Sequence, residues 1–133
     1  MATRSTIAVE HADGTVSQIY CNWDGYPEYN GKILLEHYTT LEKVEELIGH
    51  GDLSTLASNI NPTGEHSDGC VFYGRDHGED DTNARKHRDV TMYRLAKEWQ
   101  EYNYLFKSGE WYLVPTSHSS KELIPLISVF EAG

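Results

Sequence analysis

One short segment gathers most of the charged side chains that could perform chemistry. Residues 75–81 read Arg-Asp-His-Gly-Glu-Asp-Asp. Clustered carboxylates bind Mg²⁺ or Ca²⁺, but this segment lacks the alternating Asp ladder and the distal Glu of a calcium loop. A solvated loop is favoured, in which Arg75 can form a structural ion pair. We keep Arg75, Asp76 and Glu79 as candidate binding residues and assign them no metal.

Three further residues are zinc ligands by type, namely His66, Cys70 and His77. Structural zinc sites use closely spaced ligand pairs, and His66-x3-Cys70 has no second pair to match it. We expect Cys21 and Cys70 to be buried free thiols, because a chain of this length needs no disulfide. The sequence therefore predicts no metal and no cofactor.

Local signatures of enzymes are missing from the chain. It has no phosphate-binding glycine loop, no Gly-x-Ser-x-Gly elbow, no His-Glu-x-x-His motif and no dinucleotide fingerprint. We assign no catalytic residue, and an enzyme is the less favoured class. One enzymatic alternative stays open, a small metal-dependent hydrolase or nuclease that uses Asp24, Asp76, Glu79 and His77.

Residues 21–27 place two large aromatic side chains beside a glycine. Gly25 permits a positive φ and the following proline fixes the turn exit, so Trp23, Asp24 and Tyr26 are expected on a tight loop. Rigid aromatic side chains bury much area at little entropic cost, which favours a role in partner binding. The alternative is a lid that closes one end of the core, since Trp is highly buried on average.

The net charge of −10 is distributed unevenly along the chain. Residues 1–74 hold 11 Asp and Glu against 3 Lys and Arg, whereas residues 75–133 hold 10 against 8. Such a field disfavours direct binding to nucleic acid or anionic lipid, and it favours a basic protein partner or simple solubility. Glu42, Glu45 and Glu46 are the candidate contacts for a basic partner.

The elements that must position these residues begin with a hairpin. Residues 5–10 and 15–21 are rich in β-branched side chains and flank Asp13-Gly14, a strong hairpin signal. A second hairpin is predicted over 102–106 and 111–114, with a glycine in its turn. Alternation in the first hairpin assigns four residues to the core: Ile7, Val9, Ile19 and Cys21.

Helices are predicted over 31–38, 41–48, about 85–99 and 126–131. Thr40 caps the second of these helices. Its apolar face consists of Leu41, Val44, Leu47 and Ile48, with Glu42, Glu45 and Glu46 outward. The third helix has a basic exposed face and directs Met92, Leu95, Ala96 and Trp99 inward.

The remaining segments complete the predicted order ββ-αα-β-α-ββ-α. Residues 59–69 are a long loop, residues 70–73 a short central strand and residues 74–81 another loop. This order predicts an α+β fold with an about five-stranded, mostly antiparallel sheet and helices packed on one face.

The length of 133 residues predicts a single domain covering 1–133. No run of about 18 apolar residues is present, and the amino terminus is polar, so we expect a cytoplasmic protein with no membrane segment.

The chain resembles a family of small proteins encoded by tailed phages, prophages and plasmids of bacteria. The segments that carry the resemblance are residues 3–8, 20–26, 30–38, 73–79 and 101–104, of which Trp-Asp-Gly-Tyr and Arg-Asp-x-Gly-Glu are the most specific. Asn22 and His77 depart from the family pattern, which favours histidine and arginine there. The resemblance implies a mobile-element setting in a bacterial host cell, where small acidic proteins commonly bind host machinery.

Three functions are consistent with these observations. The favoured hypothesis is an accessory protein that binds and inhibits a host protein with a basic surface, such as a CRISPR or restriction complex. The second is a structural or assembly protein that forms homo-oligomers through the aromatic hairpin at 102–114. The third is the metal-dependent hydrolase or nuclease described above.

Overall fold

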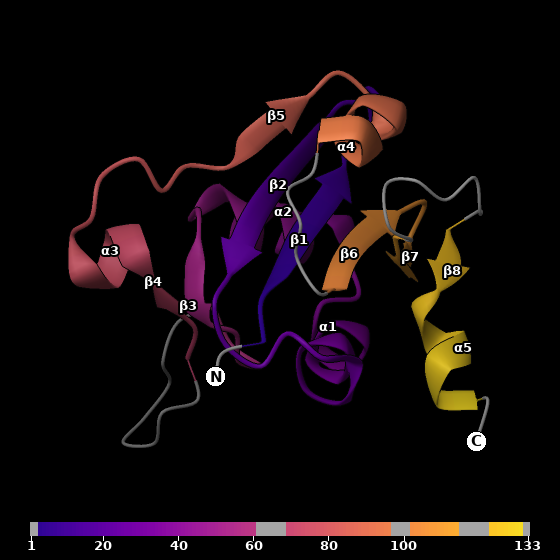
Figure 1. Cartoon of the computed structure of the whole chain (residues 1–133), viewed down its shortest axis with the longest axis horizontal. Helices are drawn as coiled ribbons and strands as arrows, with labels where there is room; N and C mark the ends of the chain where they lie inside the picture. The colour runs from indigo at the N-terminus through magenta and orange to yellow at the C-terminus, as the bar shows by residue number, and fades with distance from the viewer. Residues whose placement is uncertain (1–2, 61–68, 97–101, 115–122, 132–133) are drawn as a thin grey trace.

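The computed structural model describes residues 3–60, 69–96, 102–114 and 123–131. Within these ranges, eight strands form one mixed sheet (Figure 1). The strands are β1 (Ser5–Glu10), β2 (Val16–Cys21), β3 (Leu53–Thr55), β4 (Val71–Phe72), β5 (Arg85–His87), β6 (Tyr102–Lys107), β7 (Glu110–Leu113) and β8 (Ile124–Pro125). The helices are a π-helical turn η1 (Pro27–Gly31), α1 (Lys32–His37), α2 (Leu41–Gly49), α3 (Tyr73–His77), α4 (Val90–Ala96) and α5 (Leu126–Glu131).

The sheet corrects the prediction of about five mostly antiparallel strands. Its order is β4-β3-β2-β1-β6-β7-β8, and β5 also pairs with β2. β6 runs parallel to β1, with Ser5 opposite Tyr102, and β3 runs parallel to β2 at Cys21 opposite Leu53. The missed strands β3, β5 and β8 have two or three residues each, which is too short for an alternating pattern. The α+β class itself agrees with the structure.

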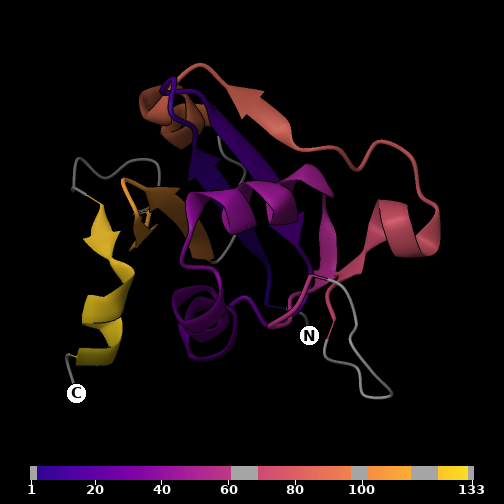
Figure 2. The ribbon, with the colours of Figure 1, turned by 180° about the vertical axis from the view of Figure 1, so that it is seen from behind.

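The helices lie on both faces of the sheet, so the prediction of one covered face is wrong. α1 and α2 cover one face (Figure 2), where Ile7, Val9, Ile19 and Cys21 are buried as predicted. α4 lies over the other face (Figure 1), where a smaller apolar cluster is centred on Tyr93. The buried apolar side chains of β1, β2 and β6 divide between the two clusters, because neighbouring residues of a strand point to opposite faces of the sheet.

The predicted helix over 85–99 begins later than expected. Arg85–His87 is strand β5, and α4 begins only at Val90. Asp89 accepts a hydrogen bond from the Met92 N–H at 2.9 Å, so it caps the helix. Met92 is 38% exposed, whereas Tyr93 is fully buried. The prediction that Met92 points inward is therefore wrong by one residue. The side chains of Leu95, Ala96 and Trp99 fall outside the described residues.

The other predicted elements are closer to the structure. Both hairpins are present, and Thr40 accepts a hydrogen bond from the Lys43 N–H at the start of α2. Within α2, Val44, Leu47 and Ile48 are buried but Leu41 is exposed. The closing helix is α5, as predicted.

The segment around residue 73 differs from its prediction in two ways. The strand expected over 70–73 is β4, which stands at the end of the strand order rather than at its centre. The following loop begins with helix α3, because the Asp76 carboxylate accepts the Phe72 N–H at 2.8 Å and Gly78 ends the helix with φ of 68°.

The outer edge of β2 is shared by two strands, which leaves a gap at Tyr20. β5 pairs with Val16–Gln18 and β3 pairs with Cys21. The Asp52 carboxylate fills the gap, since its Oδ1 accepts the Tyr20 N–H at 2.9 Å and Arg85 Nη1 at 3.2 Å. Asp52 is therefore a buried acceptor that joins three strands.

We predict that Asp52→Ala lowers the free energy of unfolding by about 1–3 kcal/mol, because the Tyr20 N–H loses its partner. Urea denaturation followed by circular dichroism measures this loss. The matched control is Asp80→Ala, an exposed position that is expected to change stability by less than about 0.5 kcal/mol. Equal stability of the two variants would contradict the assigned role of Asp52.

Candidate functional site

The loop between β2 and η1 is held through its backbone. The Trp23 N–H donates to the Ser54 carbonyl at 3.1 Å, and the Gly25 N–H donates to the Thr3 carbonyl at 2.8 Å. Tyr104 Oη donates to the Gly25 carbonyl at 2.6 Å. A Cβ on Gly25 would lie 2.8 Å from the Thr3 oxygen, so only glycine allows this approach.

Asn30 holds the same loop from inside. Its backbone N–H donates to the Asp24 carbonyl at 3.2 Å, and its Nδ2 donates to the Trp23 carbonyl at 3.1 Å. Asp24 has a φ of 56°, in the left-handed region that few residues other than glycine, Asn and Asp adopt. Hydrogen bonds to Thr3, Ser54, Asn30 and Tyr104 thus hold the backbone of the loop.

The aromatic side chains of this region point away from the core. Trp23 is 45% exposed and Tyr29 is 38% exposed. The Tyr26 and Tyr29 ring centroids lie 6.3 Å apart. Burial raises the pKa of the Tyr29 hydroxyl, and the nearby Asp24 carboxylate raises it further. Trp23 is therefore only partly covered, and it is not one of the residues of the buried core cluster.

The acidic residues of α2 divide into two kinds. Glu42 and Glu46 are exposed. Glu45 instead bonds His11 Nδ1, and His11 Nε2 lies 2.7 Å from Ser17 Oγ. This chain of contacts links the first hairpin to α2.

The contacts from Ser17 to His11 and from His11 to Glu45 resemble those of a catalytic triad, in which a serine nucleophile contacts a histidine base that is oriented by a carboxylate. Ser17 is only 6% exposed, lies within β2 and does not line the cavity that His11 borders. A nucleophile must reach its substrate, and Ser17 Oγ does not. These residues are best explained as a structural link.

The Arg75 cluster braces α3 against its neighbours. Arg75 donates to the Ile60 carbonyl at 3.1 Å and to the Cys70 carbonyl at 2.9 Å, and its guanidinium lies 4.6 Å from the centre of the Phe72 ring. Arg75 also pairs with Asp76 at 3.1 Å, which is a structural ion pair. Arg75 and Asp76 thus serve the fold, and Glu79 lies exposed in the turn that follows.

Among the described residues, Asp24, Asp76 and Glu79 do not form a group that could hold the metal ion of a hydrolase. No group of three His, Cys, Asp or Glu side chains within the described ranges is arranged to hold a metal ion. His66 and the side chain of His77 lie outside what the structure describes. Cys70 Sγ lies 3.4 Å from Tyr38 Oη and accepts from the Ala57 N–H at 3.3 Å.

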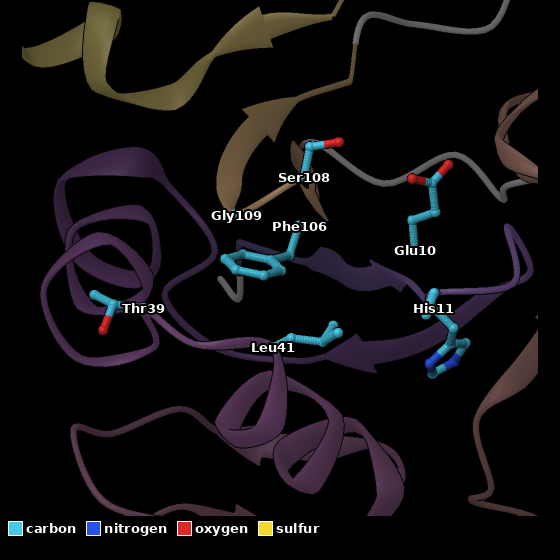
Figure 3. Close-up of a pocket in the computed structure, with 8 residues that line it drawn as sticks. Glu10, His11, Thr39, Leu41, Phe106, Ser108 and Gly109 are labelled. Atoms are coloured by element: carbon cyan, nitrogen blue, oxygen red, sulfur yellow. The ribbon is translucent and has the colours of Figure 1, made fainter.

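A groove that sequence reasoning missed lies between the α1–α2 connection and the β6–β7 hairpin. Two cavities of about 310 and 210 Å³ share Thr39, Phe106 and Gly109 in their walls. In the larger cavity, Glu10 and His11 lie together at one end and Thr39 at the other (Figure 3). Residues from several distant segments build the groove, so no local motif signals it.

The comparisons with known proteins give no relative. No protein-family model, curated protein or solved structure matches this chain. In the described part of the chain, no helix has the length and apolar character that a bilayer crossing requires.

Two substitutions in the aromatic loop should differ in their effect on stability. We expect Gly25→Ala to cost about 2 kcal/mol or more, because the added Cβ meets the backbone of Thr3. Trp23→Ala should change stability by less than about 0.5 kcal/mol, as is usual at the surface. Thermal melts of both variants measure the difference. A large loss in Trp23→Ala would show that Trp23 supports the fold.

Both cysteines should resist thiol reagents until the chain unfolds. They are free and buried, and burial raises the pKa of the Cys21 thiol to about 12 and raises that of Cys70. The thiolate is the reactive form, so native protein at pH 8 should react slowly with Ellman's reagent, and protein in urea should release two equivalents. Fast reaction of the native protein would contradict this burial.

Proposed function

We propose that the protein is a mobile-element accessory protein that binds and inhibits a basic host protein, such as a component of a CRISPR or restriction complex. The observation that carries the proposal is the exposure of Trp23, on a loop whose backbone is held by hydrogen bonds, and of Tyr29 in the adjoining turn η1. An exposed Trp with no role in the core is available for a partner.

The physical properties of the loop suit an interface anchor. Its backbone is already held by hydrogen bonds, so binding orders few additional groups. Trp and Tyr are the side chains that most often dominate binding energy. Asp24 and Glu28 place carboxylates in the same segment, and these complement Lys or Arg on a partner.

The acidic field supports a basic partner. With a net charge of −10, the protein attracts cationic surfaces over a distance of about one Debye length. Glu42 and Glu46 on α2 contribute to this field as exposed charges, which affect the association rate more than the dissociation rate. The proposal places the protein in the bacterial cytoplasm, and the phage-like segments of the sequence supply that setting.

The assembly alternative is less well supported. It relied on the aromatic residues of the hairpin at 102–114, but Tyr104, Phe106 and Trp111 are buried in the fold. The two remaining aromatic residues of this hairpin, Tyr102 and Tyr112, are half-buried.

Affinity capture from bacterial lysate tests the proposal. Immobilised protein is compared with a Trp23→Ala/Tyr29→Ala variant and with a Met92→Ala control, which also shortens an exposed apolar side chain. We expect one host protein to be enriched by the parent and the control, with at least about tenfold less on the loop variant. Equal enrichment by all three, or no enrichment, would contradict the proposal.

A further inference from the structure

The groove between the α1–α2 connection and the β6–β7 hairpin has a fixed apolar floor. The Phe106 and Trp111 rings pack edge to face, with centroids 5.2 Å apart. Trp111 Nε1 donates to the Tyr38 carbonyl at 2.8 Å, which sets the orientation of the indole. Both residues are buried, so the floor does not have to rearrange to receive a ligand.

Exposed apolar side chains form part of the walls. Leu41 lines the larger cavity and is 36% exposed, and Ile127 lines the smaller one and is 53% exposed. Each cavity has room for one or two large side chains, and the shared residue Phe106 joins them. The space suits an extended segment that places successive apolar side chains in two adjoining sites.

The charges that line the groove are acidic. Glu10 lines the larger cavity and Glu110 the smaller one, and the described lining of both contains no Lys or Arg. His11 also lines the larger cavity, where Glu45 bonds it. Lys107 lies 3.9 Å from Glu10 and offsets much of the charge of that carboxylate, so Glu110 and the net charge of −10 supply most of the acidic field.

These charges select among the possible occupants. A second copy of this chain would bring another net charge of −10 to an acidic groove, which disfavours self-association. A segment with Lys or Arg beside large apolar side chains matches both the walls and the charges.

We propose that this groove binds an extended segment of a partner protein in which large apolar side chains alternate with Lys or Arg. The apolar side chains occupy the two cavities, and the cationic groups lie beside Glu10 and Glu110. The inference rests on the groove alone and is independent of the Trp23 loop.

The probe for this site is a fluorescein-labelled peptide, Lys-Leu-Lys-Trp-Lys-Leu-Lys, measured by fluorescence polarisation against the full chain. Two comparison peptides separate the contributions. One replaces every Lys with Glu, and the other replaces Leu and Trp with Ser. We expect the first peptide to bind at least roughly tenfold more tightly than either comparison peptide. Equal binding of the Lys-Ser peptide would overturn the proposal, because it would show attraction to acidic surface only.

Variants of the protein locate the binding. Leu41→Ser/Ile127→Ser and Glu10→Lys/Glu110→Lys should each weaken binding roughly tenfold. Glu79→Lys/Asp80→Lys is the matched charge control, because it makes the same change at exposed positions that do not line the groove. Circular dichroism verifies the fold of each variant. An equal loss in the control, or no loss in the groove variants, would overturn the proposal.

One further variant separates this inference from the proposed function. Trp23→Ala/Tyr29→Ala should bind the peptide as the parent does. If the peptide fails to bind while lysate capture still depends on Trp23, the groove inference alone is wrong. If the peptide binds in the groove but lysate capture does not depend on Trp23, the proposed function alone is wrong.

Discussion

The hydrogen bond from the Tyr20 N–H to the Asp52 carboxylate is the interaction on which the candidate site depends. It closes the gap where β3 and β5 meet on one edge of β2. By fixing Asp52, it also fixes the start of β3, whose Leu53 and Ser54 carbonyls accept the N–H groups of Asn22 and Trp23 in the loop after β2. The position of the Trp23 backbone therefore depends on the buried Asp52 carboxylate. Without that carboxylate the Tyr20 N–H would be unpaired, which is energetically costly.

The same edge requires unusually close packing between distant segments. A Cβ on Gly51 would lie 2.2 Å from the Thr82 carbonyl, and that carbonyl accepts the Asp52 N–H at 2.7 Å. The positive φ of 89° at Gly51 also favours glycine. β6 pairs in parallel with the edge of β1 that does not contact β2, and this pairing attaches the second hairpin to the sheet. The groove forms where that hairpin meets the α1–α2 connection.

The sequence predicted the features that depend on local signals. Asp13-Gly14, Thr40 and the alternation of Ile7 and Val9 indicated the first hairpin, the start of α2 and the core, because each effect acts within a few residues. The two-residue and three-residue strands gave no periodic signal, and the parallel pairing of β1 with β6 depends on residues nearly one hundred positions apart. The cap at Asp89 was a usable signal for the start of α4, but the helix was predicted to begin at about residue 85.

The candidate site was predictable only in part. The glycine-bearing loop was identified from Trp23, Asp24 and Tyr26, but its backbone is also held by Asn30 and Tyr104, which no pattern connects to it. Arg75 and Asp76 were kept as binding candidates, and the structure shows that both also make contacts within the fold. The groove is assembled from distant segments, so spacing along the chain could not reveal it.

The central claim is that the Trp23 surface contacts a host protein inside the cell. Photo-crosslinking tests it directly, with benzoylphenylalanine incorporated at position 23 in one strain and at position 92 in another. The account predicts a discrete crosslinked host protein from position 23 and none from position 92. The same crosslinked proteins from both positions, or none from position 23 in the folded protein, would contradict it.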